Sequence, residues 1–271
     1  MGINACILGW IDELAAAGAF QGHSSILELG PQDFFFDRSQ LHQIAERRVG
    51  TAAATTAANL IFDVQPAFPQ RQAAFYSIFG LQEYMSTDPY DPRADIRLDL
   101  NVAQCADRQF DVVADFGTTE HVFNAGNVFV FTHNALKVGG IAIKVLPTYG
   151  DNTHGFYNIH PTVYFDIARV NGYEMVDFRY IDNMSARGGA EDTASLVSAD
   201  ELAGDLQSFA GCARLQEQIS SAFLASLQKT RTEGRMGQAH GTVDYCFVAM
   251  RKREDRPFEY PGQGVYLTEF G

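Results

Sequence analysis

Short runs of aliphatic and β-branched residues alternate along this chain with longer segments whose apolar residues recur at helical spacing. Such alternation is typical of a parallel sheet with helices packed on both faces. We therefore predict a three-layer α/β fold with a mostly parallel, seven-strand sheet. The expected strands are residues 24–30, 83–88, 94–101, 109–117, 141–147, 174–182 and 242–252.

Three of the expected helices have recognisable ends. A helix over 70–79 stops at Gly80, and a helix from about 125 to 137 stops before a Gly-Gly pair. A third, over 160–171, opens with Pro161 and closes at Gly172. Proline at the start and glycine just past the end are the usual signals of helix termini.

The 271 residues contain no internal repeat and no linker that would divide the chain. We expect a single domain over 1–271, with lid-like insertions at about 31–70 and 184–240. Apolar residues make up 46% of the chain and charged residues 20%, as in ordinary globular proteins. Apolar residues from Ile7 to Leu14 recur at helical spacing, which predicts an amphipathic N-terminal helix rather than a secretory leader.

Charge and cysteine usage restrict the partners. A formal net charge of −13, with no basic cluster beyond the run from Arg251 to Arg253, disfavours nucleic acid and anionic membrane surfaces. No apolar run approaches the ~18 residues of a membrane span. The four cysteines stand far apart without metal-binding spacing, which fits reduced thiols and a cytoplasmic location.

Chemically useful residues follow the expected strands. Ligands of an open parallel sheet bind beyond the carboxyl ends of the strands, near the point where the strand order reverses. The residues at or just after those ends are, in chain order, Glu28, Gly30, Asp88, Asp99, Asp115 and Thr118 to His121, followed by the loop after Pro147.

This ordered set resembles the class I S-adenosylmethionine-dependent methyltransferases. The segments that carry the resemblance cover roughly 24–182 and 242–252: ILELG, YMSTD, IRLDLN, FDVVADFGTTEHV and ALKVGGIAIKV. The segment HGFYNIHPTVYFDIARVNGYE is similar to methyltransferases of natural-product and surface-glycan pathways. The resemblance implies a Rossmann-like methyltransferase fold with an antiparallel last strand, S-adenosyl-L-methionine as cofactor, and methyl transfer to an oxygen or nitrogen of a small metabolite.

The resemblance also implies roles for the residues after the strands. Gly30 would let the backbone approach the cofactor, with Glu28 under its methionine end. Asp88 would bind the ribose diol, for which Asp63 is the rival, and Asp99 would hold the adenine amino group.

Three further residues complete the cofactor set. The backbone N–H of Leu100 would reach the adenine ring, and Asp115 and Phe116 would line the sulfonium end. An acid near a fixed positive charge is electrostatically sensible.

The glycine loop departs from the family pattern. The family commonly has an acidic residue followed by three alternate glycines, whereas this chain reads ELGPQDF from Glu28 to Phe34. This loss motivates one alternative, a non-catalytic methyltransferase-like partner or regulatory protein. A nucleotide-binding Rossmann oxidoreductase is a second alternative, although its GxGxxG fingerprint is absent.

The acceptor is expected to face the loop GDNTHGFYNIHP. A histidine commonly takes the proton of an oxygen or nitrogen acceptor. The candidates are His154 first and His160 second, with Tyr157 orienting the acceptor. In the structural alternative, His160 only borders the helix that starts at Pro161.

A metal site and an oligomer are the remaining questions. Asp115, Glu120 and His121 have residue types that bind metals, but the resembling loop is usually metal-free, so we expect no metal. A homodimer is compatible with the resemblance. The C-terminal segment PFEYPGQGVYLTEF either wraps a partner subunit or closes over its own domain.

Overall fold

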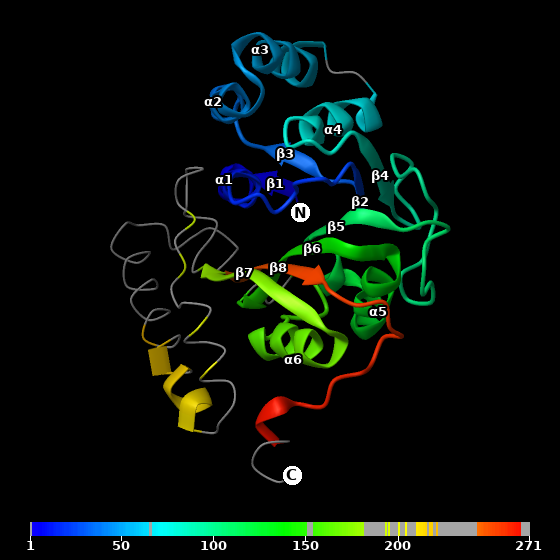
Figure 1. Cartoon of the computed structure of the whole chain (residues 1–271), viewed down its shortest axis with the longest axis vertical. Coiled ribbons are helices and arrows are strands. Elements are labelled where there is room, and N and C mark those ends of the chain that lie inside the picture. The colour runs from blue at the N-terminus through cyan, green and yellow to red at the C-terminus, as the bar shows by residue number, and fades with distance from the viewer. Residues whose placement is uncertain are drawn as a thin grey trace.

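The computed structural model describes residues 2–64, 67–150, 154–181 and 243–266, with short pieces between 193 and 221. A large sheet lies at the centre of the molecule, with helices on both of its faces (Figure 1). Its elements are, in chain order, β1 (Gly2–Asn4), α1 (Ala5–Ala16), β2 (Ser25–Leu29), β3 (Asp33–Phe35), α2 (Arg38–Val49), α3 (Thr51–Asn59), the π-helical turn η1 (Leu60–Val64), α4 (Phe68–Ser77), β4 (Glu83–Thr87), β5 (Phe110–Phe116), the 3-10 turn η2 (Thr119–His121), α5 (Ala125–Ala135), β6 (Leu136–Tyr149), α6 (Pro161–Asn171), β7 (Tyr173–Ile181) and β8 (Asp244–Lys252).

The strand order of the large sheet is β4-β2-β5-β6-β8-β7. Strands β4, β2, β5 and β6 run parallel, whereas β8 is antiparallel to both β6 and β7. The order is that of a doubly wound sheet into which β8 is inserted as an antiparallel strand. The predicted α/β architecture and the antiparallel last strand are therefore confirmed.

Six of the seven expected strands form the described sheet, so the expected count is roughly met, and the exception is the segment 94–101. Only Ile96 pairs there, through one parallel bridge to Thr87 at the edge of the sheet. The Oδ2 atom of Asp95 accepts a hydrogen bond from the backbone N of Ser86 at 2.9 Å. The Asp95 side chain thus occupies the Ser86 N–H, which would otherwise donate to a backbone carbonyl of a further strand. The pairing is therefore limited to one residue.

Side chains that alternate along the strands divide the core between the two faces of the sheet. Ile26 of β2 and Val112 of β5 pack in the cluster that α1, α2 and α4 cover. Their neighbours Leu27 and Val113 lie in the cluster that α5 covers, and α6 packs over β7 and β8. These three packed layers leave the carboxyl edge of the parallel strands to the loops.

The segment expected as the first insertion contributes to the main core. β3 pairs parallel with β1, with Gly2 opposite Asp33. Leu41, Ile44 and Ala54 from α2 and α3 are buried in the largest cluster. The second expected insertion, 184–240, lies almost wholly outside the described residues.

Both ends of the described chain pack against the domain. The predicted N-terminal helix is confirmed as α1, whose first turn Asn4 caps by accepting a hydrogen bond from Ile7 N. At the other end, Asn171 exchanges two hydrogen bonds with the backbone of Glu259, at 2.7 and 2.9 Å. The C-terminal segment therefore closes over its own domain as far as residue 266.

The helices and the cysteines of the described chain show two further features. Within the described ranges, no helix has the length and apolar content needed to cross a membrane. The four cysteines are free thiols, and Cys6 and Cys246 are buried.

Candidate functional site

Glu28 lies at the carboxyl end of β2, and its side chain is fully buried. Its Oε1 accepts a hydrogen bond from Tyr76 Oη at 2.5 Å, and its Oε2 accepts from Tyr84 Oη at 2.7 Å and from Gln32 N at 3.1 Å. Burial raises the pKa of Glu28 to about 7, and the hydrogen bonds from the two tyrosines limit that rise. This carboxyl group can therefore gain or lose a proton near neutral pH.

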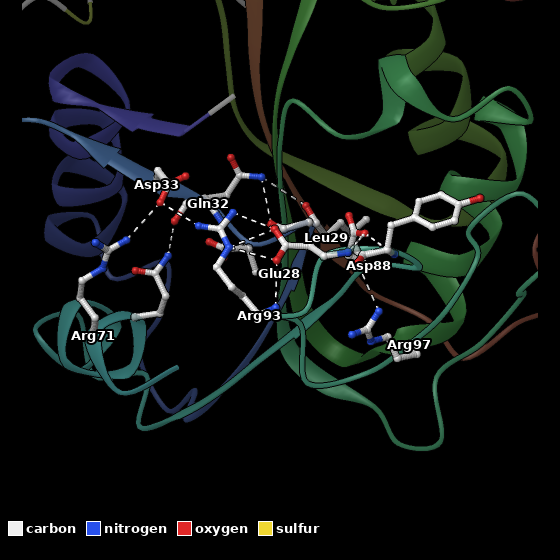
Figure 2. Close-up of polar contacts among 12 residues, drawn as sticks. Glu28, Leu29, Gln32, Asp33, Arg71, Asp88, Arg93 and Arg97 are labelled. Carbon is white, nitrogen blue, oxygen red and sulfur yellow. Dashed lines mark hydrogen bonds and ion pairs between the residues drawn. The ribbon is translucent and has the colours of Figure 1, made fainter. Parts of the chain in front are cut away.

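Two buried glutamines, Gln32 and Gln72, stand beside Glu28, and Figure 2 labels the first of them. Gln32 Nε2 donates to the carbonyl of Gly30 at 2.9 Å, and Gln72 Nε2 donates to the carbonyl of Gln32. The Oε1 atoms of both glutamines accept no hydrogen bond from the described residues. Buried acceptors are normally satisfied, so this cluster suits a ligand that brings donors, such as an ammonium group.

Two arginines lie next to this cluster and converge on Asp33, as Figure 2 shows. Arg71 Nη2 lies 3.3 Å and Arg93 Nη1 lies 2.9 Å from Asp33 Oδ1. Both guanidinium groups also stack on the ring of Phe68, at 5.3 and 4.5 Å from its centroid. Among the described residues, the buried Arg71 Nε has no hydrogen-bond partner, so a carboxylate ligand would find a donor there.

Asp88 and Asp99 lie in loops at the same edge of the sheet. Asp88 Oδ1 accepts hydrogen bonds from the backbone N atoms of Tyr90 and Asp91, at 2.7 and 2.8 Å. Asp99 is exposed, and the hydrogen bonds from Asn101 lower its pKa. Each carboxylate keeps one oxygen to which no described residue donates, and a ligand hydroxyl or amino group could use it.

Asp63, the alternative to Asp88, and Leu100 have different surroundings. Asp63 lies in η1 and pairs with the exposed Arg38. Leu100 is buried, and its carbonyl accepts a hydrogen bond from Asn127 Nδ2 at 2.8 Å. The loop that follows β4 is thus positioned from α5.

Asp115 and Phe116 end β5, and both are fully buried. The Asp115 carboxylate pairs with the buried Lys144 at 2.9 Å and accepts hydrogen bonds from Thr119 Oγ1 and from Thr118 N. The structure therefore places the oxygens of Asp115 beneath the turn after β5, where they fix Thr118 and Thr119.

Gly30 has two structural reasons to be glycine. Its φ of +74° favours glycine, and a Cβ there would lie 2.6 Å from Thr118 Oγ1. Thr118 Oγ1 in turn donates to the carbonyl of Leu29 at 2.5 Å. The turns after β2 and β5 thereby pack directly against each other, at the place where the strand order reverses.

In the loop after β6, the structure brings His154 to His121 rather than to His160. The Nε2 atoms of His121 and His154 lie 3.1 Å apart. His160 is exposed at the N-cap of α6 and caps it with no side-chain hydrogen bond. Tyr157 Oη donates to the carbonyl of Phe123 at 2.9 Å, which holds the His154 loop to the turn after β5.

Several residues of the candidate site were missed from the sequence. They are Gln32, Arg71, Gln72, Tyr76, Tyr84 and Arg93. One signal was present: Gln72 and Tyr76 are four residues apart on a helix, so they share the face that meets the end of β2. Gln32 is local to Glu28, four residues away, whereas Arg71, Tyr84 and Arg93 reach Glu28 or Asp33 only through long-range folding.

A scan against known protein families finds no match to this chain, and a search of curated proteins finds no relative. Solved structures with some likeness include one from Galdieria sulphuraria, provisionally assigned as a sarcosine dimethylglycine methyltransferase; the TM-score is 0.42 at 14% identity, with 90% of this chain and 84% of that one covered. The O-methyltransferase of a Brevibacillus brevis trans-AT PKS multienzyme, in complex with S-adenosyl-L-homocysteine, has a TM-score of 0.40 at 11% identity, over 90% and 71% of the chains. A [4+2]-cyclase has a TM-score of 0.38 at 14% identity, over 90% and 80%.

Likeness at this level leaves the activity to be argued from the site itself. The fold stands on its own strand order, in which β2 lies at the reversal point and β8 runs antiparallel between β6 and β7. The chain thus has the Rossmann-like α/β fold that its resemblance to class I methyltransferases implied.

Proposed function

We propose that this chain is an enzyme that transfers the methyl group of S-adenosyl-L-methionine to an oxygen or nitrogen of a small metabolite, such as a sugar or a natural-product intermediate. One observation carries the proposal: buried acceptor oxygens around Glu28 stand beside the guanidinium groups of Arg71 and Arg93. This cluster follows β2, the strand at the reversal point of the sheet. An amino-acid end, with its ammonium and carboxylate, needs both kinds of partner.

The residues divide the cofactor between them. Glu28, Gln32 and Gln72 would accept from the ammonium, while Arg71 and Arg93 would donate to the carboxylate. Asp88 would accept from the ribose hydroxyls, and Asp99 with the N–H of Leu100 would hold the adenine. Asp115 acts with Lys144 to hold the turn near the sulfonium end, beside Phe116.

Bound S-adenosyl-L-methionine supplies an activated methyl group, so the protein contributes mainly by holding the acceptor in line with it. The candidates for contacting the acceptor and taking its proton are His154, His160 and Tyr157. Phe123 and Phe156 are exposed beside them, with their rings edge to face at 5.9 Å. Such a surface suits an acceptor with an apolar part.

The net charge of −13 supports a small-molecule acceptor over nucleic acid. A cytoplasmic location, which fits the widely spaced cysteines, is part of the proposal. A homodimer is part of the proposal. Light scattering of the purified protein measures the mass in solution, and the mass of a single chain would contradict this part.

Calorimetric titration with S-adenosyl-L-homocysteine tests the cofactor half, because this product binds without reacting. We expect binding at micromolar strength or tighter. Loss of one charge-assisted contact in Glu28→Gln or Asp88→Ala should weaken it by about tenfold or more. Glu83→Gln is the matched control, since Glu83 starts β4 at the opposite edge and pairs with Arg108.

Two results would contradict this assignment. Absence of binding by the unaltered protein would remove the cofactor. Unchanged affinity in both Asp88→Ala and Asp99→Ala would remove those two carboxylates from the site.

A second candidate function is a non-catalytic methyltransferase-like partner protein. The observation that favours it is Gln32, which stands in the altered glycine loop and fills it by donating to the carbonyl of Gly30. Tight binding of S-adenosyl-L-homocysteine without turnover on a panel of sugars and amines would favour this candidate. Saturable NAD binding without a response to S-adenosyl-L-homocysteine would instead favour an oxidoreductase.

A further inference from the structure

Three potential metal ligands meet where the turn after β5 faces the loop after β6. They are the carboxylate of Glu120 and the imidazoles of His121 and His154, whose ligand atoms all lie within 4.8 Å of one another. The two Nε2 atoms are 3.1 Å apart, and Glu120 Oε1 is 4.0 Å from His121 Nε2. The cluster combines two nitrogen ligands with one oxygen ligand.

The backbone around the cluster is fixed by named contacts. Asp115 Oδ1 accepts from the N atoms of Thr118 and Thr119, which sets the turn that carries Glu120 and His121. The carbonyl of Glu120 accepts from Phe156 N at 2.7 Å, which ties the His154 loop to that turn.

Gly155 shows how tightly the two segments approach. A Cβ at this position would lie 2.8 Å from the Glu120 carbonyl and 2.9 Å from its Cγ. Only a residue without a side chain lets His154 come this close without a shift of the backbone. The ligands are thus positioned by the fold, which is what a binding site requires.

The distances suit a small divalent ion. Metal–nitrogen bonds of about 2.0–2.1 Å place two ligand atoms roughly 2.9 Å apart at a right angle and roughly 3.4 Å apart at a tetrahedral angle. The observed 3.1 Å lies between these values. The Glu120 carboxylate, 4.0 Å from His121 Nε2, has to move closer to the two nitrogens to complete the set.

The charge at the site also suits a cation. The Glu120 side chain is 0% exposed, whereas that of His121 is 41% exposed. The negative charge of this carboxylate would attract a cation held between it and the two imidazoles. The two histidines, exposed beside it, give an ion a route from solvent and leave coordination positions open.

We propose that Glu120, His121 and His154 bind one divalent transition-metal ion, with zinc, iron, cobalt and nickel as the chemical class. Two imidazoles and a carboxylate with open positions are a recurrent set for such ions. The set differs from the one considered in the sequence, because Asp115 is paired with Lys144 and His154 takes its place. The expectation of no metal is thereby replaced.

The consequence for activity rests on the proposed methyl transfer. An ion here would hold an oxygen of the acceptor and lower the pKa of its hydroxyl. His154 would then orient the acceptor through the ion instead of taking its proton directly. The metal site itself stands without that step.

The experiment is a Co²⁺ titration of the full-length protein after chelator treatment, followed by visible absorption and repeated with Zn²⁺ as competitor. We expect one Co²⁺ per chain and displacement by Zn²⁺. His121→Ala and His154→Ala should each weaken binding by more than about tenfold. His160→Ala is the matched control and should bind Co²⁺ like the unaltered protein.

Folding is checked separately, because Glu120 is buried whereas the two histidines are exposed. Glu120→Gln keeps the shape of the side chain, and each variant is compared by thermal unfolding without metal. No saturable Co²⁺ binding, or equal binding in both histidine variants, overturns the proposal. Titration with S-adenosyl-L-homocysteine in chelator tests the methyl-donor site alone, so failure of either proposal is recognisable.

Discussion

At the scale of single residues, the burial of Glu28 lowers the free energy of unfolding once its carboxyl group is ionised. Its carboxyl is buried between Tyr76 and Tyr84, and its pKa is raised to about 7 from 4.5. The folded protein therefore keeps a proton that the unfolded chain releases between pH 4.5 and 7. In that window the unfolded state binds fewer protons, so the free energy of unfolding falls as the pH rises.

The Glu28→Gln variant should lose this pH dependence. From pH 4.5 to pH 8, its free energy of unfolding should rise relative to that of the unaltered protein by about 3 kcal/mol, at 1.36 kcal/mol per pKa unit. Urea unfolding at several pH values measures this difference. The affinity of the Glu28→Gln variant for S-adenosyl-L-homocysteine should fall, as expected for a residue that serves function and lowers stability.

Glu83→Gln again serves as the control, since Glu83 is exposed. Its stability difference from the unaltered protein should stay flat over the same pH range. If the Glu28→Gln difference is equally flat, Glu28 is ionised throughout that range in the folded protein.

At the scale of elements, helix α5 positions the loop that follows β4. Asn127 Nδ2 donates to the carbonyls of Leu100 and Ala103, at 2.8 and 2.7 Å. The side chain is buried, so both acceptors depend on it within the protein. The loop carries Asp99, which links α5 to the proposed adenine end.

The Asn127→Ala variant should be less stable by about 1–3 kcal/mol, because one buried and one partly buried carbonyl lose their donor. It should also bind S-adenosyl-L-homocysteine more weakly, since the loop of Asp99 is released. Thermal unfolding and calorimetry measure the two effects. Asn134→Ala is the comparison on the same helix: it removes one exposed hydrogen bond to Gln104 and should leave the affinity unchanged.

Equal affinity in Asn127→Ala and the unaltered protein would separate this loop from the cofactor site. In that case the adenine would have to be held by other loops at the sheet edge. If Asn127→Ala lowers the stability and leaves the affinity unchanged, Asn127 supports the fold and has no part in cofactor binding.

At the scale of the whole molecule, the C-terminal segment closes the outer face of α6. Asn171 is fully buried and exchanges hydrogen bonds with the backbone of Glu259, while Gly264 N donates to Asp166 at 3.0 Å. Phe258 packs on the cluster beneath α6. The segment after β8 is therefore part of the domain's packing.

Asn171→Ala should release this segment. Hydrogen exchange at residues 258–266 should become faster, because the reciprocal hydrogen bonds are lost, while β2 and β5 keep their protection. Mass spectrometry of exchange measures both regions in one experiment. Asn158→Ala, which removes an exposed contact to Gly150, should change neither; unchanged exchange in Asn171→Ala would show that other contacts hold the segment.

The sequence by itself determined the layers and most of the elements. Local patterns suffice for this: the expected strand at 109–117 appears as β5, and the helix expected to end at Asn171 does end there before Gly172. Strand ends also place Glu28 and Asp88 at one edge, because the parallel strands β2 and β4 share their direction.

Only the tertiary structure decided which side chains meet at that edge. Asp95 takes the N–H of Ser86 and ends a strand that the pattern of 94–101 predicted. Tyr76 is 48 residues from Glu28, and His154 is 33 residues from His121, so no local pattern connects either pair. Periodicity reports which face a residue occupies, whereas these contacts depend on how the turns after different strands pack together.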